Sequence, residues 1–88
     1  MTWLVRLSAD AKKQVDRLPT DRQDQLLRAL REMTQDPFRG DVKPLKGRDW
    51  KGWYRRRIGR YRVIFLPQHQ DHIIAVSAIV PKSEKTYR

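Results

Sequence analysis

The sequence of 88 residues contains no cysteine. A disulfide framework, a thiolate metal site and a cysteine nucleophile are therefore excluded. No apolar run approaches the roughly 20 residues that cross a membrane, and the first residues lack the charged and then apolar order of a signal peptide. We therefore expect a cytoplasmic protein, and the length predicts one domain over residues 1–88.

The familiar sequence motifs of enzymes are also missing. There is no glycine-rich phosphate-binding loop and no helix with paired histidines. The two histidines, His69 and His72, flank a predicted turn without a further ligand nearby, so we expect turn residues rather than a metal site. The serines lack evident histidine and aspartate partners for nucleophilic catalysis. No metal ion or other cofactor is therefore expected.

Positive charge is the strongest feature of the composition. Twenty lysines and arginines face ten aspartates and glutamates, which gives a formal net charge of +10. Such a surface attracts polyanions, namely nucleic acid, an anionic membrane or an acidic protein. No basic amphipathic helix carries bulky aromatic residues on one face, which disfavours the membrane. We therefore expect nucleic acid as the main partner.

Hydrophobic periodicity predicts the order strand, helix, helix, strand, strand, strand. The expected strands cover residues 3–7, 53–58, 61–66 and 72–80, and the expected helices start at Ala9 and Thr20. The first helix should end near Arg17, before Pro19, and the second before Pro37. Residues 38–52 are rich in glycine and proline and should form a loop. The last strand is apolar nearly throughout and suits a central place in a sheet.

Local signals support the two helices. Ser8 is a good N-cap for the first helix, and Thr20 with Gln23 forms a capping-box pattern for the second. The apolar stripe expected to face the core consists of Leu26, Leu27, Leu30 and Met33. Together these elements predict an α+β fold, in which the N-terminal strand and an antiparallel helix hairpin pack on an antiparallel β-sheet, in the order β-α-α-β-β-β.

Arginines gather in the two strands around a short predicted turn. In residues 53–58, alternation places Arg55 and Arg57 on one face and Tyr54, Arg56 and Ile58 on the other. Arg62 follows the turn at Gly59 and Arg60, so it should lie close to Arg57. Guanidinium groups fixed in this way suit phosphate oxygens.

Such a constellation could cleave RNA without a histidine. The 2′-hydroxyl attacks the neighbouring phosphate, and preorganised cations stabilise the charge that builds on the phosphoryl oxygens. A tyrosine or lysine can exchange the protons when nearby cations lower its pKa, and Tyr87 and Lys82 are candidates. Trp50, Trp53 and Tyr54 could stack on bases. The alternative is that the arginines only bind an acidic partner and the aromatic residues fill the core.

The same residues carry a resemblance to a known family. Residues 44–47 (PLKG) and 53–65 (WYRRRIGRYRVIF) resemble the RelE/ParE toxin signature, in which a leucine-lysine-glycine loop precedes alternating arginines and an apolar strand. Residues 11–19, the Asp36-Pro37 pair and the terminal Tyr87 fit the same pattern. The resemblance covers essentially the whole chain. Each motif is degenerate, and their order and spacing make the match fairly specific.

The resemblance implies the toxin of a toxin–antitoxin pair. In the RelE branch the toxin enters the ribosomal A site and cuts mRNA there, so it inhibits translation as an mRNA interferase. The residues that match its catalytic positions are Arg57, Arg62 and Tyr87, with Arg55 and Lys82 as further candidates. The expected RNA-binding residues are Lys46, Arg56, Arg60, Trp53 and Lys85. This chain has Lys82 and Lys85 where the family often has an arginine before the terminal tyrosine.

Two other functions stay open at this point. The ParE branch shares the fold and inhibits DNA gyrase, and a third possibility is a non-catalytic basic module held by an antitoxin. The retained Arg57, Arg62 and Tyr87 favour the RelE branch. The expected partners are the ribosome, mRNA and an acidic, partly disordered antitoxin that forms a hetero-oligomer with the toxin.

Overall fold

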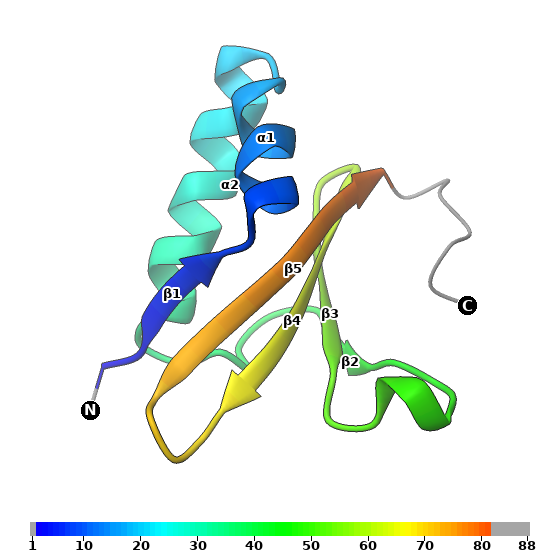
Figure 1. Ribbon diagram of the computed structural model, residues 1–88. Coiled ribbons are helices and arrows are strands. Elements are labelled where there is room, and N and C mark those ends of the chain that lie inside the picture. The colour runs from blue at the N-terminus through cyan, green and yellow to red at the C-terminus, as the bar shows by residue number, and fades with distance from the viewer. Residues whose placement is uncertain (1, 82–88) are drawn as a thin grey trace.

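The computed structural model describes residues 2–81, which form a five-stranded sheet with two helices on one face (Figure 1). The strands are β1 (Leu4–Leu7), β2 (Val42–Pro44), β3 (Tyr54–Ile58), β4 (Tyr61–Gln68) and β5 (Ile73–Pro81). The helices are α1 (Ala9–Asp16), α2 (Thr20–Met33) and a short 3-10 helix, η1 (Arg48–Trp50). The predicted α+β class is confirmed.

The sheet has the strand order β1-β5-β4-β3-β2. The pairs β2–β3, β3–β4 and β4–β5 are antiparallel, and β1 runs parallel to β5 at one edge. The expected central place of the last strand is therefore confirmed. The predicted antiparallel meander of the last three strands is confirmed. The direction of the first strand was not predicted, and it is parallel to β5.

The predicted β-α-α-β-β-β order omits one strand. Residues 38–52 were expected to form only a loop, yet Val42–Pro44 pairs with Tyr54–Arg56 as an edge strand, and η1 follows it. The strand expected at residues 61–66 is longer than predicted, since β4 continues to Gln68 and Pro67 is buried within it. Pro67 is the cross-strand partner of Ile74 of β5.

The start of α1 agrees with the sequence. The Ser8 hydroxyl accepts a hydrogen bond from the Ala11 amide at 3.0 Å and so caps the helix. The capping box predicted for α2 is wrong. Thr20 already lies inside α2, Pro19 is the N-cap residue, and no side chain caps this end. The Gln23 side chain instead donates to the Val15 carbonyl of α1 at 3.1 Å and ties the two helices together.

The main core lies between the helices and the sheet. Leu26, Leu30 and Met33 of α2 are buried there as predicted, whereas Leu27 is 37% exposed and Ala29 is buried in its place. The apolar stripe of α2 is thus rotated slightly toward Ala29. From the sheet, the side chains of Val63 and Phe65 point into this core and are fully buried.

A second, smaller apolar cluster lies on the opposite face of the sheet, which we call the open face because no helix covers it. Its buried members are Ile64, Ala78 and Val80. Leu45, Trp50 and Trp53 pack against them from the segment between β2 and β3. This segment covers only part of the open face (Figure 1). Among residues 2–81, no helix has the length and apolarity that a membrane crossing requires.

Candidate nucleic-acid interface

Two arginines face each other on the open face. Arg57 of β3 and Arg62 of β4 are direct cross-strand partners beside the turn at Gly59, as the sequence predicted. Alternation along β3 and along β4 turns both side chains away from the helices, because their neighbours Ile58 and Val63 belong to the main core. On its other side, Arg62 has Val80 of β5 as its neighbour. Like charges directly opposite each other destabilise an antiparallel pair, so this arrangement does not serve the stability of the free fold.

Neither arginine of this pair has a counter-ion within residues 2–81. No carboxylate in that part of the chain lies within ion-pair distance of Arg57 or Arg62. The Nε atom of each is shielded from solvent and has no hydrogen-bond acceptor there. The sheet therefore holds two half-buried guanidinium groups with unused hydrogen-bonding capacity. A phosphate group matches both the charge and the donor geometry of such a pair.

The neighbouring row of the open face is also cationic. Lys43 of β2 is the cross-strand partner of Arg55, which lies two residues before Arg57 on β3. Arg55 differs from the Arg57–Arg62 pair because its Nη1 lies 3.5 Å from a carboxylate oxygen of Asp41. Asp41 is held in place by its own backbone, whose carbonyl accepts from the Arg57 amide at 3.0 Å. Arg55 is therefore partly neutralised.

Arg56 lies on the helix face of the sheet, and the prediction that it binds RNA does not fit this position. Its side chain is buried. Nη2 donates to the carboxylate of Glu32 at 3.1 Å, and Nη1 donates to the Ala29 carbonyl at 3.4 Å. The arginine thus joins β3 to the C-terminal half of α2. Gly40 approaches it closely, since a Cβ at Gly40 would lie 3.3 Å from Nη2.

Aromatic residues border the cationic rows. Trp50 and Trp53 meet edge to face, with ring centroids 5.6 Å apart, and both belong to the apolar cluster of the open face. Tyr54 points the other way and stacks on Phe65 in the main core. Trp53 therefore remains a candidate for stacking on RNA bases, whereas Tyr54 does not reach that face.

The structure describes two of the remaining candidate residues, Lys46 and Arg60. Lys46 lies exposed in the segment after β2, and Arg60 lies exposed in the turn between β3 and β4. Tyr87, Lys82 and Lys85 lie outside the described residues. Lys43 was missed because it was assigned to a loop. The alternating pattern of a strand was too short to reveal it.

The two histidines pack with aromatic rings. His72 stacks on Trp3 with ring centroids 4.7 Å apart, and His69 stacks on Phe38 at 5.9 Å. His72 also has a φ of 53°, which a turn residue can adopt. Across residues 2–81, no group of three potential metal-ligating side chains comes together. Both histidines thus stand in the turn region where the sequence placed them.

The strand order, the helix hairpin and the uncovered cationic face of the sheet can be compared with known proteins. A model of the ParE toxin of type II toxin–antitoxin systems matches residues 5–86 of this chain. The protein therefore belongs to the RelE/ParE family and is the toxin of a toxin–antitoxin system. A search of curated proteins gives no match.

Solved structures of toxins share this fold. The archaeal RelE–RelB complex from Pyrococcus horikoshii OT3 contains a chain with 27% identity and a TM-score of 0.80, and the match covers 96% of this protein and 99% of that chain. The RelBE2 toxin–antitoxin complex from Mycobacterium tuberculosis gives 21% identity, a TM-score of 0.80, and coverage of 92% and 99%. The YoeB/ParE toxin from Agrobacterium tumefaciens has 18% identity and a TM-score of 0.75, and the match covers 89% of this protein and 96% of that chain.

Proposed function

We propose that this toxin is a ribosome-dependent endoribonuclease that cuts mRNA in the ribosomal A site. The observation that carries the proposal is the Arg57–Arg62 pair, two facing cations on the open face without a carboxylate partner in residues 2–81. A pair that weakens the free fold is best explained by a bound anion. The phosphate between two nucleotides is such an anion, and the overall charge of +10 attracts RNA to the surface.

The reaction uses the 2′-hydroxyl of the RNA itself. Its oxygen forms a bond to the adjacent phosphorus, and the bond from that phosphorus to the 5′ oxygen of the next nucleotide breaks. One group removes the proton of the 2′-hydroxyl, and another delivers a proton to the leaving oxygen. Arg57 and Arg62 stabilise the negative charge on the phosphoryl oxygens as it increases. The products are a cyclic phosphate and a free 5′-hydroxyl.

The proton-transfer groups come from the end of the chain. In this proposal Tyr87 and Lys82 exchange the protons, and Lys85 contacts the RNA backbone. The last described residue, Pro81, is the cross-strand partner of Tyr61, one position from Arg62. Six residues span at most about 20 Å, so Tyr87 is within covalent reach of the arginine pair. Arg55, Lys46 and Arg60 add positive charge around this centre, with Arg55 weakened by Asp41.

The test is to map mRNA cuts in a translating cell-free extract, with ribosomes stalled at a defined codon. The wild-type toxin should cut within the A-site codon and leave naked RNA intact. Arg62→Gln should reduce cutting at least a hundredfold, in the range seen when one group that stabilises a developing oxyanion is removed. Arg28→Gln is the matched control, because it removes the same charge from an exposed position of α2. Intact mRNA with the wild-type toxin would refute the proposal.

An antitoxin should cover the same face. The similar structures from Pyrococcus horikoshii OT3 and Mycobacterium tuberculosis are complexes of a toxin with its antitoxin. For the present chain we propose an acidic, partly disordered antitoxin that forms a hetero-oligomer and competes with RNA for the cationic rows. Its binding should weaken as the salt concentration rises. An antitoxin complex that still cuts mRNA at the wild-type rate would contradict this arrangement.

The second candidate function is inhibition of DNA gyrase. It is favoured by the match of residues 5–86 to a model of ParE toxins. Gyrase poisoning predicts DNA breaks that depend on gyrase and an intact mRNA pool in cells that express the toxin. The cell-free mRNA assay and a DNA-cleavage assay with purified gyrase therefore separate the two functions. We rank mRNA cleavage above gyrase inhibition because of the Arg57–Arg62 pair.

A further inference from the structure

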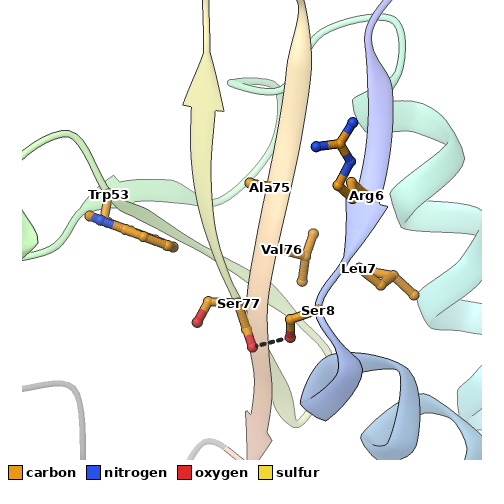
Figure 2. Close-up of a pocket in the computed structure, with 7 residues that line it drawn as sticks. All are labelled: Arg6, Leu7, Ser8, Trp53, Ala75, Val76 and Ser77. Atoms are coloured by element: carbon orange, nitrogen blue, oxygen red, sulfur yellow. Dashed lines mark hydrogen bonds between the residues drawn. The ribbon is translucent and has the colours of Figure 1, made fainter.

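A hollow of about 270 Å³ opens on the sheet beside Trp53 (Figure 2). We call it the Trp53 hollow. The residues that matter for its chemistry are Arg6, Trp53, Ala75 and Ser77. Its volume is just below the roughly 300–1,000 Å³ of sites that enclose whole small molecules. The hollow therefore suits one flat group rather than a complete nucleotide.

The strand register explains why the sheet is hollow there. Ala75 of β5 lies between Leu66 of β4 and Arg6 of β1, and its methyl group leaves the floor low. Ser77 is an additional residue in β5, because Ile64 and Phe65 are consecutive in β4 but pair with Ala78 and Val76. Bulges of this kind redirect side chains and recur beside functional sites.

The walls of the hollow differ in chemistry. Figure 2 shows the indole ring of Trp53 on one side of β5 and the guanidinium group of Arg6 on the other. Arg6 has no carboxylate partner in residues 2–81. Ser8 is already occupied, since its hydroxyl donates to the Ser77 carbonyl at 2.7 Å and accepts from Ala11. The Ser77 hydroxyl has no hydrogen-bond partner in the described part of the chain and is free for a ligand.

The hollow lies on the same face as the Arg57–Arg62 pair. Trp53 immediately precedes β3 and stands four positions before Arg57, which corresponds to about 13 Å of extended chain at 3.3 Å per residue. A single strand of RNA with one phosphate at the arginine pair can therefore reach the hollow with a nearby base. An aromatic ring stacks on any base, a cation attracts the RNA backbone, and a hydroxyl can distinguish the edges of bases.

We propose that the Trp53 hollow binds one unpaired RNA base close to the cleaved phosphate and sets the base preference at that position. The inference rests on the proposed ribonuclease function. An apolar side chain of a protein partner would also fill the volume. It would leave the Arg6 charge and the Ser77 hydroxyl without a partner, which is why RNA is the occupant that we argue for.

The first test measures binding and does not depend on cleavage. A labelled oligoadenylate and the same oligomer with one abasic position are titrated with the toxin at low salt. The abasic position should weaken wild-type binding roughly tenfold, because one stacked base is lost. Ala75→Leu fills the floor of the hollow, so this variant should bind both oligomers equally. The abasic penalty of the wild type should thus be absent in the variant, which shows that the base and the hollow are coupled. Arg28→Gln should retain the wild-type difference.

Folding problems are separated from loss of the hollow by a conservative variant. Trp53→Phe keeps a stacking ring and should retain most of the abasic penalty, whereas Trp53→Ala should lose it. Thermal unfolding of each variant is measured beside the titrations. An abasic penalty that stays the same in Ala75→Leu overturns the proposal, and so does the absence of a penalty in the wild-type toxin.

The second test compares cut positions in the translating extract. The relative cutting at different bases next to the cleaved phosphate should be flatter for Ala75→Leu than for the wild type, whatever the overall rate. A wild-type toxin that cuts no mRNA refutes the proposed function, and the oligomer titration then still decides about the hollow. Unchanged base preference in Ala75→Leu refutes the hollow alone. If Ala75→Leu binds RNA normally but loses the antitoxin, the occupant is a protein side chain and the proposal is wrong.

Discussion

Replacement of Arg62 by glutamine should stabilise the free toxin while it abolishes activity. Arg62 faces Arg57 across the strands, and its other neighbour, Val80, is apolar. If the two guanidinium charges are taken as about 7 Å apart, they repel by about 0.6 kcal/mol in water and by about 2.4 kcal/mol at an effective dielectric constant of about 20. The substitution removes this repulsion and one unsatisfied Nε group. It retains the first two methylene groups, so most of the packing of the stem remains.

The expected gain in the free energy of unfolding lies between the two dielectric limits, at about 0.6–2.4 kcal/mol. For a domain of this size, about 1 kcal/mol corresponds to a rise of roughly 4–8 °C in Tm. Calorimetry or urea unfolding of the isolated toxin measures the change. The gain should shrink as salt is added, because salt screens the repulsion between partly exposed charges.

Arg55→Gln is the matched control on the same face. Arg55 already has the Asp41 carboxylate at 3.5 Å, so its removal should lower stability slightly or leave it unchanged. A loss of more than about 1 kcal/mol in Arg62→Gln, beyond the normal effect of a surface substitution, would show that Arg62 holds the sheet together. The argument for an anion site at the Arg57–Arg62 pair would then fail.

Three further predictions concern the fold and the surface. Arg56→Ala should lower the free energy of unfolding by about 1–3 kcal/mol in urea, because it removes buried hydrogen bonds to a carboxylate and a carbonyl; a change as small as that of Arg28→Ala would contradict this role. Ser8→Ala should lower the free energy of unfolding by about 1–2 kcal/mol, because the cap of α1 is lost. Thr20→Ala should change it by no more than about 0.5 kcal/mol, and equal losses in the two variants would indicate that Thr20 does cap α2. Oligoadenylate affinity should fall with salt at a log–log slope of at least about −0.7 in magnitude, the value for the one phosphate at the Arg57–Arg62 pair, and a slope near zero would exclude phosphate contacts.

The strands around the arginines could be predicted because successive side chains of a strand point to opposite faces of the sheet. Tyr54 and Ile58 are the aromatic and apolar residues of β3 that face the main core, and Arg56 lies between them on the same face. Alternation then places Arg55 and Arg57 together on the other face. The short turn at Gly59 then placed Arg62 opposite Arg57. These contacts are local in sequence, so the pattern of a few residues determines them.

Features that depend on distant partners could not be predicted in this way. β2 has three residues, one of them a proline, and it is a strand only because β3 pairs with it. The position of Arg56 depends on Glu32, 24 residues earlier in the chain. The Trp53 hollow depends on the bulge at Ser77, which exists only in the register between β4 and β5. In each case a long-range contact decides what the local pattern leaves open.

The parallel pairing of β1 with β5 has a consequence for the timing of folding. β1 is the first strand to be synthesised and β5 the last, and Ser8 reaches Ser77 across 69 residues of chain. At about 5–20 residues per second, a nascent chain spends several seconds with β1 unpaired. During that time the sheet lacks β5, which lies between β1 and β4, and the row that places Arg6 beside Ala75 does not exist. A partly synthesised chain therefore cannot form the Trp53 hollow, because its floor at Ala75 and the bulge at Ser77 belong to β5.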